Sequence, residues 1–193
     1  LSSVQLWNIA NETYTLYAQW ATCRIGDGQG NYTYYVSLQE AIDAVSSGDT
    51  KTIEMLVSDY PINKTINFKD TSSGAAQKIM ITTVQDTAYL PEGTVTRFYR
   101  PVDIQSAPTQ YTFTGDLFNL NTNGGNNVNA ELTLDNISVD GSGFPRTGTT
   151  RVTQAGLLFN VGSDAKLTLG AGGETATIKD NYHAGNAGAI VSA

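Results

Sequence analysis

The chain has 193 residues, of which 11 are basic and 18 acidic, so its net charge is −7, and charged residues make up only 15% of it. This length fits one domain of ordinary size. An acidic chain without basic clusters lacks the positive surface that nucleic acid or an anionic membrane attracts. No apolar run approaches the roughly 18 residues of a membrane-spanning helix. We therefore expect neither a nucleic-acid partner nor a membrane span, and 40% hydrophobic residues exclude a disordered chain.

The first predicted strand covers residues 13–20, where threonine and aromatic residues alternate with apolar ones and end at Trp20. Residues 26–31 (GDGQGN) then predict a turn or linker, and residues 32–36 are again strand-like. Cys23 is the only cysteine, so it cannot form an intramolecular disulfide. We expect it to be a small buried hydrophobic side chain.

One amphipathic helix is predicted immediately after this strand. Ser37 and Glu40 have the S-x-x-E spacing of a capping box, and Gly48 is expected to end the helix. The apolar stripe repeats at the spacing of helical turns and consists of Leu38, Ala41, Ile42 and Val45.

After Asp49 the chain indicates only short strands, bounded by Gly, Asn, Asp or Ser. Several have an apolar-x-apolar form, which directs two side chains into one core and one outward. The predicted strands are 52–57, 64–68, 78–84, 96–99, 111–113, 117–121, 131–134, 137–139, 157–161, 166–169, 176–178 and 189–191.

These strands recur. The triplet Leu-Thr-Leu at 132–134 returns 35 positions later at 167–169, and the Gly-Leu-Leu at 156–158 matches Gly-Ala-Ile at 188–190, 32 positions later. Three predicted strands lie within each repeat, which favours a three-sided solenoid. The preceding repeat, from Leu117 to Leu157, has 40 positions, and its excess, residues 144–153, predicts an external loop.

A solenoid also explains the helix, which can cover the open edge of the first coil as terminal caps do in repeat proteins. The alternative architecture is a β-sandwich, which also has many short strands. It accounts less well for the three-strand recurrence and for the scarcity of two-residue hairpin turns.

Two stretches resemble known families. Trp7 together with residues 13–20 (TYTLYAQW) resembles the C-terminal end of the Listeria–Bacteroides repeat, the B-repeat module of internalin-type Gram-positive surface proteins. From Ser37 onward, SLQEAIDA, a Gly-Asp turn, LTL and DGSG resemble pectin-lyase-like β-helix regions of bacterial surface proteins. The tail is similar to the F-x-x-N and G-G-A-I pairs of chlamydial polymorphic membrane proteins, although Ile178 and Ala187 depart from both leading positions.

The resemblance implies an all-β fold: a right-handed parallel β-helix with three strands per coil and a short N-terminal amphipathic capping helix. It places the end of a B-repeat-like module at residues 1–22, a linker and first strand at 23–36, and the helix and coils at 37–193. It implies an extracellular or cell wall-associated bacterial protein. The last coil stops at Ala193 without a cap, which predicts end-to-end self-association at an unpaired strand edge.

We therefore predict a non-catalytic stalk or adhesin segment, with a carbohydrate-active enzyme (a polysaccharide lyase or glycosidase) as the alternative. The best catalytic arrangement is Asp135 and Asp140 with Arg146 and Arg151, but Asp-Asn and Asp-Gly pairs are also what turns require. His183 is the only histidine, and residues 27–31 lack the spacing of a calcium loop. We predict no catalytic residue, cofactor or metal.

The candidate ligand site is the loop 144–153, with Phe144, Pro145, Arg146 and Arg151, and its expected partner is a host glycan or a matrix protein. The alternative is that Phe144 covers a coil edge and the arginines offset Asp140. Side-chain ladders between coils, which are structural, are predicted for Asn119, Asn121 and Asn160.

Overall fold

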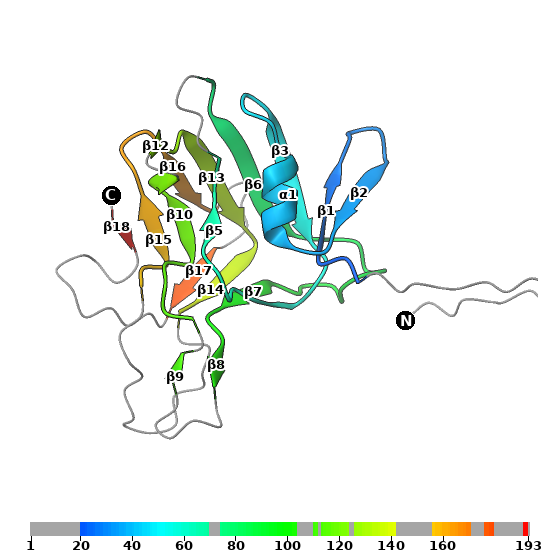
Figure 1. Cartoon of the computed structure of the whole chain (residues 1–193). Coiled ribbons are helices and arrows are strands. Elements are labelled where there is room, and N and C mark those ends of the chain that lie inside the picture. Colours follow the sequence, from blue (N-terminus) through cyan, green and yellow to red (C-terminus); the bar gives the residue numbers. More distant parts are fainter. Residues whose placement is uncertain are drawn as a thin grey trace, which may run out of the picture.

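The computed structural model describes residues 20–69, 74–103, 110–111, 113–123, 126–141, 156–170, 176–179 and 191–192. This part of the chain is β-rich, with several parallel sheets and one α-helix (Figure 1). The predicted predominance of strands is therefore confirmed. Of the segment that resembles a B-repeat, residues 1–19 lie outside the described residues, and Trp20 is largely exposed.

Three sheets build the fold. The largest has the order β16 (Lys166–Leu169), β13 (Ala130–Asp135), β6 (Gln77–Thr83), β3 (Thr50–Met55), β1 (Cys23–Gly26) and β2 (Tyr32–Tyr35). The second contains β18 (Val191–Ser192), β15 (Phe159–Val161), β10 (Phe118–Leu120) and β5 (Ile66–Asn67). The third contains β17 (Thr177–Lys179), β14 (Ile137–Asp140), β7 (Thr96–Tyr99) and β4 (Asp59–Pro61).

Two small antiparallel pairs lie outside these sheets, β8 (Val102–Asp103) with β9 (Gln110–Tyr111), and β11 (Thr122–Asn123) with β12 (Asn126–Asn127).

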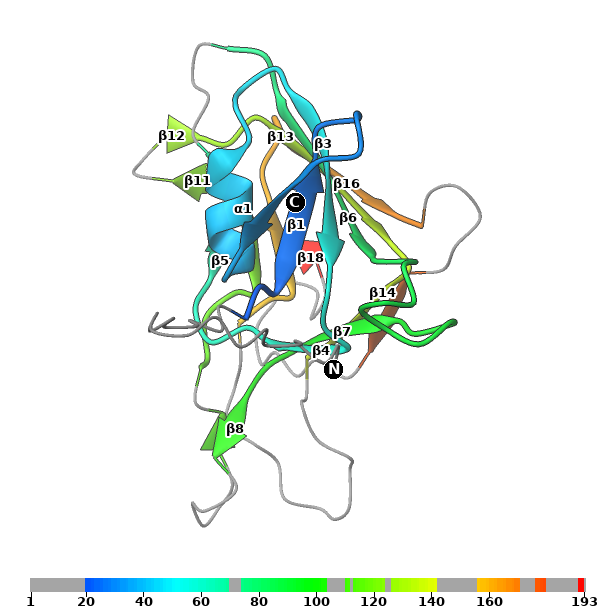
Figure 2. The ribbon, with the colours of Figure 1, turned by 90° about the vertical axis from the view of Figure 1, so that its right-hand side faces the viewer.

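From β3 onward the described chain visits the three sheets in a constant order. The rounds are β3-β4-β5, β6-β7-β10, β13-β14-β15 and β16-β17-β18, and each strand pairs in parallel with its counterpart in the preceding round. Seen from the side of the β1–β2 hairpin, the sheets surround a common interior (Figure 2). The recurrence of three strands in the sequence therefore corresponds to one round of the chain.

Two of the three predicted repeat spacings agree with the register. Leu132 lies beside Leu167, and Phe159 lies beside Val191, as spacings of 35 and 32 require. The third is wrong by one residue, because Phe118 pairs with Phe159, 41 positions later. Stacking of these two buried rings, 5.3 Å apart and nearly parallel, favours this register over one that aligns Leu117 with Leu157.

Of the turn or linker predicted at residues 26–31, the structure has the turn, and the strand before it was not predicted. Residues Cys23–Gly26 form β1, which pairs antiparallel with both β2 and β3. The residues between β1 and β2 make the turn of this hairpin. Gly28 and Gly30 have φ values of 80° and 91°, and the Asp27 carboxylate accepts hydrogen bonds from the backbone N–H groups of Gln29 and Asn31. The hairpin therefore extends the largest sheet by two strands.

The predicted helix, α1 (Leu38–Ala44), begins where the capping box places it. The Ser37 hydroxyl accepts a hydrogen bond from the Glu40 backbone N–H at 3.2 Å. The helix ends before Gly48, because the extended Val45 is its C-cap. Lys69 and Gln77 donate to the Val45 carbonyl, at 3.0 and 2.9 Å, so side chains from later strands satisfy the helix end that a glycine was expected to close.

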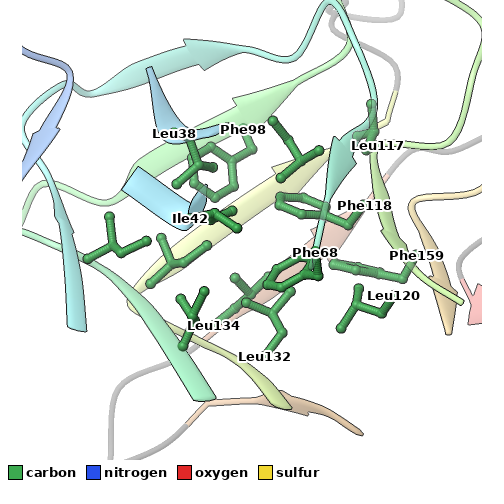
Figure 3. Packing of buried hydrophobic residues seen from close by; sticks show 14 of the residues in the cluster. Leu38, Ile42, Phe68, Phe98, Leu117, Phe118, Leu120, Leu132, Leu134 and Phe159 are labelled. Atoms are coloured by element: carbon green, nitrogen blue, oxygen red, sulfur yellow. The ribbon is translucent and has the colours of Figure 1, made fainter. Parts of the chain in front are cut away.

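The helix packs against the β1–β2 hairpin and against β5 of the first round. All four residues of its apolar stripe are buried in the main core, and Leu38 and Ile42 point toward the phenylalanines of the later rounds (Figure 3). On its other side, the Gln39 amide accepts from the Asn67 N–H at 2.9 Å and donates to the Asn67 carbonyl at 2.8 Å. This side chain thereby bonds to the backbone of β5 as a neighbouring strand would.

Cys23 is fully buried, as the sequence predicts, and burial raises the pKa of its thiol to about 11. We expect 5,5′-dithiobis(2-nitrobenzoic acid) to modify it at pH 8 only as fast as the protein unfolds, because the thiolate is the nucleophile. A raised pKa contributes stability below the unfolded-state pKa of about 8.5, and this contribution is lost as the pH rises through about 11. Rapid labelling of the native protein would contradict this expectation.

Candidate functional site

The predicted ligand loop, residues 144–153, belongs to the part of the chain that the structure does not describe. Phe144, Pro145, Arg146 and Arg151 lie outside the described residues, as does His183. The loop therefore stays a prediction, and the candidate sites below come from the described part of the chain.

The two aspartates of the catalytic alternative belong to different sheets. Asp135 ends β13 in the largest sheet, whereas Asp140 ends β14 in the third. The turn prediction is therefore wrong in detail, because both residues lie in strands and Asn136, with a φ of 51°, occupies the corner between them.

Asp140 is buried and has cationic partners on the neighbouring strands. Its carboxylate lies 3.7 Å from the guanidinium of Arg97 on β7 and 3.7 Å from the ammonium of Lys179 on β17. Arg97 also pairs with Asp59 on β4 at 2.8 Å. These charges form a ladder across four consecutive strands of the third sheet, which is a structural role for Asp140.

Asparagines form a second ladder along the second sheet, as predicted for Asn119, Asn121 and Asn160. Asn119 lies in register between Asn67 and Asn160, and its amide donates to the Asn67 side-chain oxygen at 3.0 Å. Asn121 donates to the Asn160 side-chain oxygen at 3.1 Å, and Asn160 donates to Asp116 at 3.1 Å. These amides bond successive rounds to one another.

The loop at 27–31 is a closed turn. The Asp27 carboxylate accepts a hydrogen bond from the Asn31 side chain at 2.7 Å, and this bond and that from Gln29 lower its pKa. In the part of the chain that the structure describes, no group of three or more His, Cys, Asp or Glu is placed to hold a metal ion.

A hollow of about 660 Å³ lies beside α1 and is lined by polar side chains that include Gln39, Asp43, Tyr60, Lys64 and Lys69. Several of these groups already have partners. Gln39 donates to Asp43, Tyr60 accepts from the Leu38 N–H, and Lys69 donates to the end of the helix. Their arrangement supports the cap and does not present a convergent set of reactive groups.

Three tyrosines form an exposed cluster at the N-terminal hairpin, two on β2 and one in the loop after β6, which we call the tyrosine surface: Tyr32, Tyr34 and Tyr89. Tyr32 and Tyr34 alternate on β2 and so project from one face of it, with ring centres 6.5 Å apart. The hydroxyl oxygens of Tyr34 and Tyr89 lie 2.8 Å apart in a hydrogen bond. Tyr32 is 40% exposed, Tyr34 is 47% exposed and Tyr89 is 40% exposed.

The side chain of Arg24 packs against two rings of this cluster. Its guanidinium carbon lies 3.7 Å from the centre of the Tyr32 ring and 4.9 Å from that of Tyr89. Its Nε donates to Glu54 at 2.6 Å, and Arg24 is only 4% exposed. Arg24 lies in register between Tyr34 on β2 and Glu54 on β3, so the sheet itself sets this row of side chains.

The absence of a side chain at Gly26 leaves room for the Tyr32 ring. Gly26 lies opposite Tyr32 in the hairpin, and a Cβ there would come within 3.2 Å of the ring.

The hydroxyl groups of Tyr34 and Tyr89 also influence each other's ionisation. Their shared hydrogen bond lowers the pKa of Tyr34 and raises the pKa of Tyr89.

Comparison with known proteins gives no match: no protein-family model, no curated protein and no solved structure matches this chain significantly. Among the described residues, no helix has the length and apolar character that crossing a membrane requires. The candidate sites therefore rest on their geometry.

Proposed function

We propose that this chain forms a right-handed parallel β-helix segment of a bacterial cell-surface or secreted protein and serves as a non-catalytic stalk or adhesive scaffold. The constant order in which successive rounds visit three parallel sheets supports this architecture. The resemblance of residues 13–20 and 37–193 to modules of bacterial surface proteins supports an extracellular or cell wall-associated location.

The single observation that carries the proposal is the ladder bonding between rounds. Paired phenylalanines, asparagines and ion pairs join each round to the next, and each added round lengthens such a stack by about 4.8 Å. A scaffold of this kind resists bending because its parallel backbone ladders and several side-chain rows repeat along its axis. Stiffness along one axis is what a stalk requires.

The enzymatic alternative has less support. The buried carboxylate of Asp140 is held by Arg97 and Lys179, and Asp135 belongs to another sheet. An acid or base must reach a proton on its substrate, so a group with two cationic neighbours inside a strand ladder is poorly suited to that role.

The partner, a host glycan or a matrix protein, is proposed to contact the loop 144–153. The test replaces residues 144–153 with a Gly-Ser linker and compares both proteins on a glycan and matrix-protein array. We expect binding by the intact chain and its loss in the variant. Binding that survives the replacement would contradict the loop site.

The same preparations test the absence of catalysis. Incubation with pectic, β-glucan and glycosaminoglycan polysaccharides is expected to release no unsaturated or reducing sugar. Release by the intact protein would contradict the non-catalytic proposal.

End-to-end self-association also stays a prediction, to be tested by light scattering as a function of concentration.

A further inference from the structure

We propose that the tyrosine surface on the N-terminal hairpin is a binding site for a neutral saccharide. The inference rests on the proposed function only in taking this segment to be a binding surface. It names a site that the sequence did not single out and a ligand class for it.

Contacts within the protein already hold the side chains of this site in place. Arg24 fixes the rings of Tyr32 and Tyr89 by cation–π contacts, and the hydrogen bond between Tyr34 and Tyr89 joins the strand to the loop that follows β6. Tyrosines lose little conformational entropy on binding, and these are already restrained.

Charge selects the ligand class. Arg24 already makes the cation–π contacts that the Tyr32 and Tyr89 rings offer, so a cationic ligand would have to share these rings with it. An anionic ligand finds no compensating charge, because Arg24 is buried and paired with Glu54, and the whole chain has a net charge of −7. A neutral ligand with both apolar and hydroxylated faces remains.

The size and chemistry of the cluster agree with one or two sugar rings. At 40–47% exposure, three tyrosines present roughly 300 Å² together. A stable protein–protein interface needs about 800 Å² on each partner, which this cluster does not supply. The ring faces can pack on the C–H face of a pyranose, and the hydroxyls of Tyr34 and Tyr89 can exchange hydrogen bonds with sugar hydroxyls.

The test is saturation-transfer NMR with the full chain and neutral hexasaccharides: cellohexaose, maltohexaose, mannohexaose and the fully N-acetylated chitohexaose. Oligogalacturonate of the same length serves as the anionic comparison. We expect transfer to the C–H protons of at least one neutral sugar and weaker transfer to the anionic one. Tyr34→Ala and Tyr32→Ala should each weaken binding by at least about fivefold, as at the centre of a small contact.

Tyr99→Ala is the matched control, because Tyr99 also stacks with an arginine, Arg97 at 4.8 Å, but lies on the third sheet. It should leave binding unchanged. If an alanine variant does not fold, chemical-shift changes of ¹³C-labelled tyrosine rings in the unaltered protein, assigned with Tyr34→Phe, locate the contact instead.

The inference is overturned if no neutral hexasaccharide binds at millimolar concentration, if the Tyr34→Ala variant binds equally well, or if shift changes are confined to other tyrosines. Recognition of a matrix protein alone would overturn it too. Each leaves the proposed scaffold in place, whereas release of sugar would contradict the non-catalytic function and leave the tyrosine contact standing.

Discussion

Replacing Ile42 with aspartate is expected to lower the free energy of unfolding by about 3–5 kcal/mol, the range for an uncompensated polar group and lost packing in a core. Ile42 is fully buried between α1 and the first round, beside Leu38 in the core that Figure 3 shows. The isoleucine side chain belongs to the apolar core cluster, so a carboxylate in its place would lose the water that stabilises its charge. Urea unfolding followed by circular dichroism measures the change.

Asp43→Asn is the control for this variant. Asp43 is exposed on the opposite side of α1, and asparagine keeps an oxygen that can accept the 3.0 Å hydrogen bond from Gln39. We expect a change within about 0.5 kcal/mol, as for surface substitutions. Similar losses of stability in the two variants would mean that α1 is not docked on the core.

The helix and most strands could be predicted because their signals are local. A stripe at helical spacing, a capping box and apolar-x-apolar triplets are each complete within ten residues. The triplets even set the register in one place, where Leu132 lies beside Leu167. The end of the helix was misplaced because its carbonyls are satisfied by Lys69 and Gln77, which no local pattern connects to it.

Strands β1 and β4 escaped prediction for different reasons. The sequence CRIG of β1 is four residues long and borders a glycine-rich turn, so only its pairing with β2 and β3 makes it a strand. β4 contains Pro61 and lies at the edge of its sheet, where a proline is tolerated. In both cases, pairing with other strands determines that the segment is a strand.

The tyrosine surface was beyond sequence reasoning because its parts are distant in the chain. The alternation of Tyr32 and Tyr34 was visible as a strand pattern, but Tyr89 lies 55 positions after Tyr34. Arg24 gave no signal either, since an isolated arginine in a supposed linker is usually solvated. Only the three-stranded row of Tyr34, Arg24 and Glu54 shows that the arginine is buried and organises the rings.

The role of Arg100 could not be predicted from the sequence either, because there it is an ordinary basic residue after a short strand. In the fold it is fully buried, and its guanidinium donates to backbone carbonyls in two successive rounds. One amino group bonds to Phe113 at 3.2 Å and to Gly115, and the other bonds to Gly156 at 3.2 Å and Leu157 at 3.4 Å. It therefore joins the corner before β10 to the corner before β15.

Arg100→Met keeps much of the side-chain volume but removes these donors, so we expect a loss of about 3–5 kcal/mol, because several carbonyls at these corners lose a donor at about 1–3 kcal/mol each. The Leu157 carbonyl retains its bond from the Leu117 N–H, whereas the carbonyls of Phe113 and Gly115 lose the arginine. Lys78→Met removes one positive charge from an exposed pair with Glu131 and should cost no more than about 1 kcal/mol. Denaturant midpoints compare the two. If they shift equally, water replaces the guanidinium at these corners, and Arg100 does not hold the rounds together.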